Sequence, residues 1–412
     1  MMSTVDVLVV GGGPVGACVA ALLVRGSGSS PTPLSVMVLE PSRPGLPQAG
    51  SALDPRVVAI SRASEHILNA AGAWSRIQGS RVTAYERMRV WHESISPVSA
   101  DVLVFDAAEA REPNLGHIAE NRLVQAALLE SLVADGGRVE PVGVQSVHVG
   151  EDCVEVTTEA GKLSARLVVG ADGSHSAVRD LVGLTADMTD YQQRAIVATV
   201  VTERPHQDTA WQRFMRDGTL AFLPLADGNS SIVWSADNDL AAALLARPTA
   251  DFEAELDRAS DHALGTTRLA SERASFPLKG LAAHRYVARR CALVGDAAHV
   301  VHPLAGQGVN LGLMDAAALA QLILEGARQR EDPGALRLLR RYERWRKSEV
   351  AVMNAAILAF DRFLAHGTGP LSRIAQRGLG FVNRSQEIKR LFITRALGMA
   401  GELPQAALVG RG

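Results

Sequence analysis

Hydrophobic residues open the chain in a pattern of strand, turn and helix. Residues 5–10 are mostly apolar, and three glycines at 11–13 separate them from a run that stays uncharged to Val24. The glycines interrupt any continuous hydrophobic helix, and Asp6 lies where a signal peptide would carry a positive charge. We therefore predict a buried strand, a turn and a helix ending near Arg25, rather than a membrane span.

The pattern changes several times along the rest of the chain. Strands are predicted where short runs are apolar or alternate with polar residues, at 36–39, within 138–169, and at 195–201, 220–224, 231–235 and 291–294. The strands at 220–224 and 231–235 flank the turn 226–229 and predict a hairpin. Helical spacing of apolar residues predicts helices at 64–71, 123–134, 240–246, 251–258, from about Val309, and at 333–366. This mixture predicts an α/β (α+β) fold.

Composition narrows the class of protein. A chain of 412 residues can build two cores, and 47% hydrophobic with 21% charged residues is typical of a globular protein. A net charge of −2 gives no general attraction to nucleic acid, and no nucleic-acid partner is expected. Cys18, Cys153 and Cys291 lie far apart in apolar surroundings, which predicts free thiols in a reducing cytoplasm.

Two glycine-rich turns are candidates for binding a cofactor. Gly11, Gly13 and Gly16 fit G-x-G-x-x-G, in which the glycines make the turn, admit a pyrophosphate and pack helix on strand. Glu40, after the second strand, lies where a carboxylate binds an adenosine ribose, although a solvated strand end explains it as well. The second turn follows residues 291–294, and its candidate residues are Asp296, Pro303, Gly306, Gln307, Gly308, Val309 and Asn310.

The residue types of the second turn suit a different part of the cofactor from that expected at the first turn. Asp296 can accept hydrogen bonds from sugar-like hydroxyls, and the glycines let the backbone approach a flat ring because no Cβ intervenes. The helix that begins near Val309 directs free N–H groups and a positive dipole end to the same place. The turn therefore predicts a cofactor with a polyol arm and an electron-poor ring; an ordinary strand–loop–helix with glycine caps is the alternative.

Three motifs, at residues 11–16, 170–179 and 295–313, occur in the order in which one family of enzymes carries them. GDAAHVVHPLAGQGVNLGL at 295–313 resembles the second flavin-binding motif of the single-component FAD-dependent aromatic hydroxylases, and it is most similar to the branch that hydroxylates ubiquinone precursors. GADGSHSAVR at 170–179 is similar to the element between their two other motifs. The resemblance implies a Rossmann-like FAD-binding domain at 1–75, 100–180 and 281–332. An inserted β-sheet substrate domain at 76–99 and 181–280 and C-terminal helices at 333–412 would complete the chain.

The resemblance also implies roles for individual residues. Arg56 would reach the pyrophosphate or the flavin edge, and Arg122 the ribityl–phosphate arm. Asp172 and Gly173 would lie near the pyrophosphate. Pro303 and Gln307 would lie beside the flavin ring, where backbone N–H groups at 307–309 can hold negative charge. No side chain is predicted to be catalytic, and no metal site is expected.

The resemblance implies FAD as cofactor and NAD(P)H and O2 as co-substrates. Reduced flavin would trap O2 as a C4a-hydroperoxide and hydroxylate the ring of a polyprenyl phenol or quinol in ubiquinone biosynthesis. NAD(P)H would dock transiently, because no second G-x-G-x-x-G follows a strand; a separate reductase stays open. The alternatives are a hydroxylase of soluble aromatic compounds, a prenyl-chain reductase, or a non-catalytic flavoprotein bound to other ubiquinone-biosynthesis proteins at a membrane.

Two regions bear on substrate and location. Phe222, Pro224 and Trp234 are candidates to line the substrate pocket, and core packing explains them equally well. Basic residues are interleaved with apolar ones over 362–395, which suits peripheral contact with the anionic inner face of the plasma membrane. A helix docked on the protein with a solvated basic face is the other interpretation. The chain is expected to be cytoplasmic or peripheral.

Overall fold

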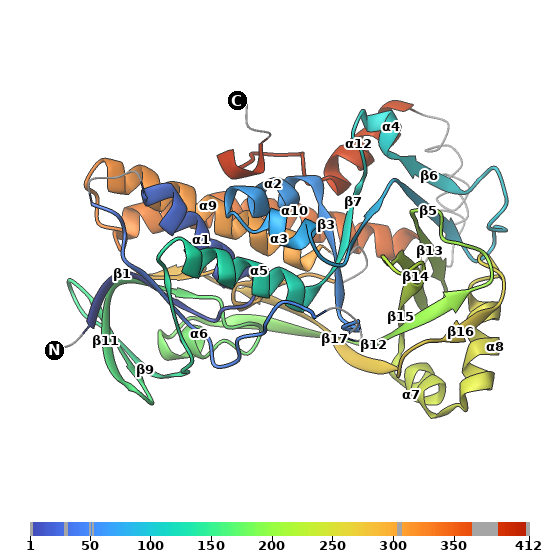
Figure 1. Ribbon diagram of the computed structural model, residues 1–412, viewed down its shortest axis with the longest axis horizontal. Coiled ribbons are helices and arrows are strands. Elements are labelled where there is room, and N and C mark those ends of the chain that lie inside the picture. The colour runs from blue at the N-terminus through green and yellow to red at the C-terminus, as the bar shows by residue number, and fades with distance from the viewer. Residues whose placement is uncertain are drawn as a thin grey trace.

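Two large β-sheets stand side by side in the computed structural model, which describes residues 3–28, 32–48, 51, 53–302, 307–364 and 386–408. One sheet has eight strands, the other nine, and a three-stranded sheet accompanies them. Figure 1 shows the N-terminal strands at one end of the molecule and α7 and α8 at the other. The mixed α/β class predicted from the sequence is confirmed.

Parallel strands form the centre of the eight-stranded sheet. In order these are β2 (Val36–Leu39), β1 (Ser3–Val10), β11 (Gly161–Gly170) and β19 (Cys291–Leu293). Their carboxyl ends are level, because Val10 pairs with both Leu39 and Gly170, and Gly170 pairs with Leu293. The flanking strands are β8 (Arg138–Glu140), β9 (Val144–Val149), β10 (Val154–Thr158) and β18 (Val287–Ala288). The antiparallel run β9–β10–β11 is the predicted meander.

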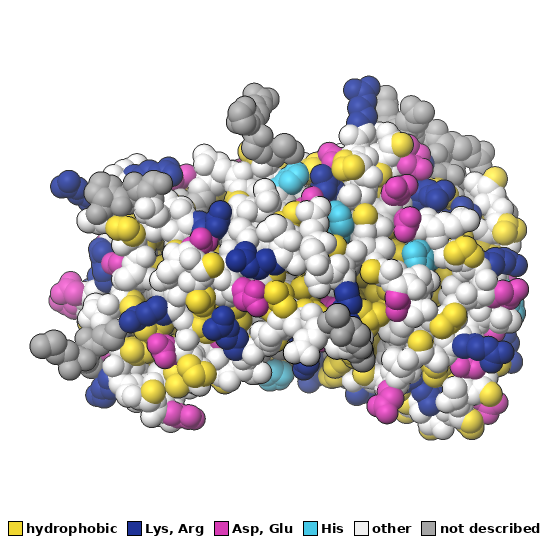
Figure 2. Space-filling view, in the orientation of Figure 1, with side chains coloured by type: hydrophobic (Ala, Val, Ile, Leu, Met, Phe, Trp, Pro, Cys, Tyr) yellow, Lys and Arg dark blue, Asp and Glu magenta, His cyan; other side chains and the backbone are white. Residues whose placement is uncertain are grey.

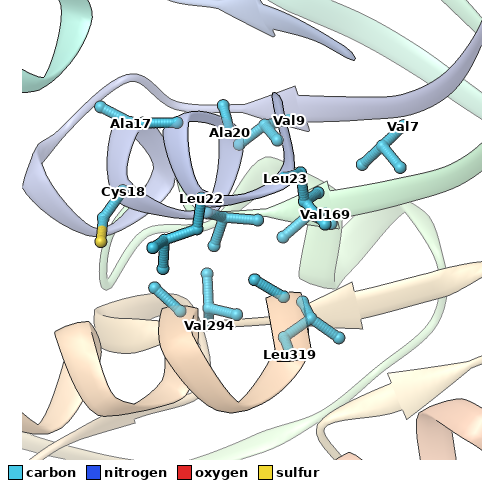
Figure 3. Close-up of a cluster of buried hydrophobic side chains, with 14 of the residues drawn as sticks. Val7, Val9, Ala17, Cys18, Ala20, Leu22, Leu23, Val169, Val294 and Leu319 are labelled. Carbon is cyan, nitrogen blue, oxygen red and sulfur yellow. The ribbon is translucent and has the colours of Figure 1, made fainter. Parts of the chain in front are cut away.

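Helices α1 (Pro14–Ser27), α5 (Asn121–Ala134) and α9 (Gly308–Arg328) belong to the same core. Figure 3 shows apolar side chains of α1, β1 and β11 meeting Val294 and Leu319. The uncharged run near the N-terminus is thus divided into β1 and α1, as predicted. α9 is long and apolar enough to cross a membrane, but most of it is packed inside the protein.

The nine-stranded sheet carries the predicted hairpin. Its strands, in order, are β20 (His299–Val300), β17 (Ala274–Ala283), β12 (Ala186–Thr202), β15 (Ser230–Asp237), β14 (Gly218–Pro224), β13 (Thr209–Met215), β5 (Arg87–His92) and β6 (Leu103–Asp106), with β16 (Thr267–Leu269) beside β12. The antiparallel pairing of β14 with β15 confirms the hairpin. Helices α7 (Asn238–Ala246) and α8 (Thr249–Ala259) cover one face. α8 begins after Pro248, two residues before the expected start.

Strand pairing crosses the domain limits expected from the sequence. β6 and β20 lie in ranges assigned to the FAD-binding domain, but they pair within the nine-stranded sheet. β4 (Val82–Tyr85) lies in a range assigned to the substrate domain, but it pairs with β7 (Gly116–Glu120), which also pairs with β3 (Val57–Ser61). Pairing partners depend on which edges meet in space, and local sequence does not encode this.

The C-terminal helix α12 (Gln386–Ala396) is docked on the protein. Ile393 and Leu397 are buried against Leu115 and against Ala107 of α4 (Ala107–Ala110), and Lys389 Nζ donates to Glu109 Oε1 at 2.6 Å. The interpretation of a docked helix therefore fits these residues. Phe392, at 41% exposure, faces solvent. The basic residues Arg373, Arg377 and Arg384 lie outside the described part of the chain.

The other helices surround these sheets. They are α2 (Arg62–Ala70), α3 (Trp74–Gln78), α6 (Ala177–Leu181) and the long α10 (Leu336–Leu364), with 3-10 turns η1 (Gly295–Ala297) and η3 (Gln405–Ala407). Acidic and basic side chains are interspersed over the face seen in Figure 2, in keeping with the small net charge.

Candidate cofactor site

Four sequence motifs meet at one edge of the eight-stranded sheet. The glycine turn follows β1, Glu40 follows β2, Asp172 follows β11 and Asp296 follows β19. These strands are neighbours with level carboxyl ends, so motifs nearly 300 residues apart in the chain lie side by side. Ligands of open α/β sheets bind at this edge.

The three glycines of the first turn have the separate roles that the motif predicts. Gly11 has a φ of +97°, and a Cβ on it would lie 2.4 Å from the carbonyl oxygen of Ala171. A Cβ on Gly16 would lie 2.0 Å from the carbonyl oxygen of Gly11, so this glycine allows α1 to pack on β1. Gly13 has no atom within 4 Å of its would-be Cβ. The first and third glycines are needed by the fold, whereas Gly13 leaves open space for a ligand.

Glu40 is tied to the first glycine turn. Its Oε2 accepts a hydrogen bond from Gly12 N at 2.7 Å, and its Oε1 accepts one from Ser42 N at 2.9 Å. Both bonds fix the carboxylate beside the turn, in the half-exposed position expected for a ribose contact. Each oxygen keeps a second lone pair with which it can accept a hydroxyl hydrogen.

Asp172 has a structural role that the motif did not indicate. Its two oxygens accept hydrogen bonds from Ser176 Oγ and Val178 N, so the carboxylate caps the short helix α6. The adjacent Gly173 has a φ of +81° and open space around its would-be Cβ. The backbone at Gly173 is thus better placed to meet a cofactor than the Asp172 side chain.

Asp296 and Arg56 approach one another from different elements. Burial raises the pKa of the Asp296 carboxyl above its ordinary value, His299 and the exposed Arg56 just before β3 lower it in part, and the negative charge of Asp315 adds to the rise. The Asp296 side chain nevertheless reaches solvent. Because this carboxylate reaches solvent at the end of a buried strand, it can accept a hydrogen bond from a cofactor hydroxyl.

The N-terminus of α9 completes the described part of the site. Gln307 is the N-cap, and Gly308 has no atom within 4 Å of its would-be Cβ. Asn310 differs from the expectation of cofactor contact: its Oδ1 accepts from Ser61 N at 3.0 Å and its Nδ2 donates to Ala59 O at 2.8 Å, so it fastens α9 to β3. Val309 is half-buried. Pro303 and Gly306 lie outside the described residues.

Arg122 is highly exposed and held by an acidic partner. Its Nε lies 3.2 Å from Asp54 Oδ2, and Asp54 also binds Arg56 N through Oδ1 at 2.8 Å. Asp54 therefore links the two arginines expected at the cofactor. Its position next to a proline suggested only a loop, so sequence reasoning gave it no role.

A buried charge cluster beneath the second turn was also missed. Asp315 of α9, fully buried, accepts hydrogen bonds from Gly295 N at 3.0 Å, His299 Nε2 at 2.6 Å and Arg346 Nε at 2.8 Å. Burial opposes ionisation, but His299 and Arg346 hold the pKa of Asp315 below its ordinary value. One carboxylate in the alanine-rich helix was the signal available in the sequence.

Helix α10 and α6 hold the same turn from two further sides. Tyr342 Oη donates to Leu293 O at 2.8 Å, one helical turn before Arg346. The buried Arg179 of the 170–179 motif donates through Nη1 to Ala297 O at 3.2 Å. The motifs around Asp172 and Asp296 are thus bonded directly to each other, and the turn that presents Asp296 is fixed by α6, α9 and α10.

The predicted substrate residues lie in a hydrophobic core instead. Phe222 and Trp234 are buried with residues of α7 and α8, and the Trp234 ring lies 6.1 Å from that of Phe252. Pro224 is on the same face, because alternate residues of a strand share a face. The core interpretation therefore holds for these residues.

Fold and site together define a flavoprotein of the aromatic hydroxylase type. Open glycines and fixed carboxylates at the strand ends fit the diphosphate, ribose and polyol of FAD. The fold is similar to that of p-nitrophenol 4-monooxygenase from Pseudomonas putida, with a TM-score of 0.73 and 21% identity over 96% of this chain and 99% of that one. It is also similar to PqsL of Pseudomonas aeruginosa in complex with 2-aminobenzoylacetate (TM-score 0.70, 25% identity, 91% and 99% coverage).

The chain belongs to the family described as FAD binding domain, which matches residues 4–355. It is 37% identical to ubiquinone hydroxylase UbiL of Rhodospirillum rubrum, over 99% of this chain and 92% of that protein. It is 34% identical to 3-demethoxyubiquinol 3-hydroxylase of Escherichia coli, over 96% and 98% of the two chains. The protein is an FAD-dependent monooxygenase, and the resemblance to the ubiquinone-pathway branch is confirmed.

Proposed function

We propose that this protein hydroxylates the aromatic ring of a polyprenyl phenol or quinol intermediate of ubiquinone biosynthesis, with NAD(P)H and O2 as co-substrates. The observation that carries the proposal is the similarity to two named ubiquinone-pathway hydroxylases over at least 96% of this chain. It is supported by the meeting of all cofactor motifs at one sheet edge. FAD, when bound, supplies the electron transfer and oxygen activation that side chains lack.

The protein's own groups bind and orient the cofactor in this proposal. Gly13 and Gly173 let the backbone approach the diphosphate, while Glu40 accepts hydrogen bonds from the adenosine ribose. Asp296 accepts hydrogen bonds from the polyol arm, and Arg56 offsets part of the negative charge nearby. Arg122 is a second cationic contact to the phosphates.

The start of α9 acts on the flavin ring. The first-turn N–H groups of an α-helix have no partner within the helix, and Gln307, Gly308 and Val309 supply such groups here. With the positive end of the helix dipole, these N–H groups would favour negative charge on the edge of a flavin ring placed there. The Asn310 side chain keeps this helix end in place by holding β3.

The substrate wall is the face of the nine-stranded sheet away from α7 and α8. Ala221 and Val233 pair across β14 and β15, and both are half-buried at positions between fully buried neighbours. Met88 lies on the same face and packs near Ile393 of α12, so this face turns toward the C-terminal helices. Ala221 and Val233 offer a small apolar contact for a lipophilic ring, and the hydroxyls of Thr219, Ser231 and Ser235 lie on the same face.

Val233→Trp tests the wall. The larger side chain should raise KM for a polyprenyl phenol at least tenfold, because it occupies space that the substrate ring needs and displaces the ring. The flavin spectrum should be unchanged. Val98→Trp, in a loop where Val98 is 83% exposed, is the matched control and should behave as wild type. A Val233→Trp enzyme with unchanged KM would show that the substrate lies elsewhere.

The reaction itself is tested with purified holoprotein, an oxygen electrode and two classes of phenol. Isotopically labelled O2 should appear in the hydroxylated product of a lipophilic phenol and not of a soluble one. Oxygen uptake that equals peroxide release with every phenol would refute hydroxylation. Quinone profiling of a deletion strain then names the ring position, because the precursor before the missing step accumulates.

We also propose a cytoplasmic protein that contacts the inner face of the membrane and other ubiquinone-biosynthesis proteins, since its substrate is lipophilic. Within the described residues, Arg390 and Phe392 are the exposed basic and apolar residues of α12. Membrane contact is assigned to Phe392, and Arg390 lies on the other flank of the docked side, because residues two apart on an α-helix point in nearly opposite directions. The docked side, with Ile393 and Lys389, is used by the fold.

A further inference from the structure

A cavity lies between β18 and α10. Its volume is about 430 Å³. Four apolar side chains and four charged ones line it: Leu184, Val287, Ala288, Leu336, Arg285, Arg289, Arg340 and Glu343. None of these residues belongs to the cofactor motifs, and the proposed hydroxylation gives them no role.

The cavity carries an excess of positive charge. Arg285, Arg289 and Arg340 are all exposed, and within the described ranges none of the three forms an ion pair with a carboxylate. The neighbouring arginines of α10 behave differently: Arg337 pairs with Glu331 at 2.8 Å and Arg341 with Glu325 at 3.5 Å. Among these three arginines of α10, Arg340, which lines the cavity, is the one without a carboxylate partner in the described ranges.

The single lining carboxylate is already committed to the fold. Glu343 Oε1 accepts a hydrogen bond from Tyr286 N at 2.7 Å, next to Arg285 in the chain. Arg289 makes one weak bond, from Nη2 to the Glu151 carbonyl oxygen at 3.3 Å. Three cationic groups against one anchored anion leave a net charge of about +2 facing the cavity at neutral pH.

We propose that this cavity binds a phosphate or diphosphate group. Guanidinium groups offer paired N–H donors in a planar fork that matches the oxygens of phosphate, and a partly enclosed cavity strengthens each such bond. Leu184 and Leu336 at the rim suit a ligand that joins its phosphate to an apolar part. The shared chemistry is a phosphoryl anion, whether it comes from a nucleotide in solution or from the headgroup of an anionic lipid.

The cavity shares α10 with the cofactor motif. Glu343 faces the cavity, while its neighbour Tyr342 holds the carbonyl of Leu293 and Arg346 holds Asp315. The anion site therefore lies behind the second cofactor turn, on the same rigid helix. The inference does not depend on the proposed oxygen chemistry, because it rests on charge and shape at different residues.

The test uses full-length protein saturated with FAD, so that the cofactor's own diphosphate site is filled. Binding of inorganic pyrophosphate is measured by calorimetry at low salt, and binding to phosphatidylglycerol vesicles by sedimentation against phosphatidylcholine vesicles. Arg340→Gln and Arg285→Gln should each weaken binding roughly tenfold, as loss of a charge-assisted hydrogen bond predicts. Added salt should weaken wild-type binding as well.

Arg341→Gln is the matched control, because it removes the same charge from the next position of α10 outside the cavity. Pyrophosphate binding that is lost in the cavity variants and kept in the control supports a soluble ligand. Binding to anionic vesicles but not to pyrophosphate, lost in the cavity variants and kept in the control, supports a lipid headgroup. The proposal is overturned if wild type binds neither probe, or if the control loses as much affinity as the cavity variants. Flavin absorbance confirms folding of each variant.

Discussion

Arg346→Met tests whether the buried charge cluster holds the second cofactor turn. Arg346 is 3% exposed and Asp315 0%, and the variant leaves the Asp315 carboxylate with Gly295 N and His299 as partners. Removing one member of a buried ion pair costs about 3–5 kcal/mol, because the remaining charge stays desolvated. The retained His299 contact places this variant at the lower end, about 3 kcal/mol of unfolding free energy.

The same variant should also change the response to acid. A carboxyl whose folded pKa lies below its ordinary value of 3.8 stabilises the protein above that value, and this contribution is lost as the pH falls through the folded pKa. Without Arg346, which helps to lower the pKa of Asp315, the folded pKa rises. Acid unfolding of Arg346→Met should therefore begin at a higher pH than in wild type.

Urea unfolding, monitored by flavin and tryptophan fluorescence, measures the free energy of unfolding. Titration of the apoprotein with FAD measures its affinity for the cofactor. Both should fall, since the turn that presents Asp296 loses a support. Arg344→Met is the control: Arg344 is exposed on the same helix, and surface substitutions usually change stability by less than about 0.5 kcal/mol. An Arg346→Met protein as stable as this control would refute the reasoning.

Three further predictions follow from the site and the surface. Asp296→Ala should purify mostly as apoprotein, and a full flavin spectrum would refute the polyol contact. Gly13→Val should weaken FAD binding at least tenfold with little change in stability, whereas Gly16→Val should lose about 1–3 kcal/mol of unfolding free energy, because its Cβ meets the Gly11 carbonyl; equal effects on stability would contradict this division of roles. Phe392→Ser should reduce sedimentation with anionic vesicles at unchanged thermal midpoint, and an unchanged partition would exclude α12 as the membrane contact.

Deletion of residues 362–412 would be a poor test of membrane contact. It would expose the core around Leu115, which Ile393 and Leu397 cover, and remove the bond from Trp345 Nε1 to Glu402 O at 3.0 Å. A change in partition could then reflect unfolding. Substitution at an exposed position of α12 avoids this problem, because no buried contact is lost.

The failed substrate assignment has a physical cause. Alternation along β14 and β15 shows that Phe222 and Trp234 share a face, but both faces of this sheet carry apolar residues. The alternation of side chains along a strand shows which residues share a face, but it does not show which face packs against helices and which contacts a ligand. Packing of α7 and α8, which lie later in the chain, decides it.

The amino-acid sequence by itself indicated the cofactor and the turns proposed to bind it. Each turn has a local signature, a glycine or an acid within a few residues of a buried strand, and such a signature can be read from the sequence. Only the tertiary structure decided that Asp172 caps a helix, that Asn310 holds β3, and that Asp315 pairs with Arg346. These roles depend on contacts between segments far apart in the chain, and such contacts form only when the strands have taken their order in the sheet.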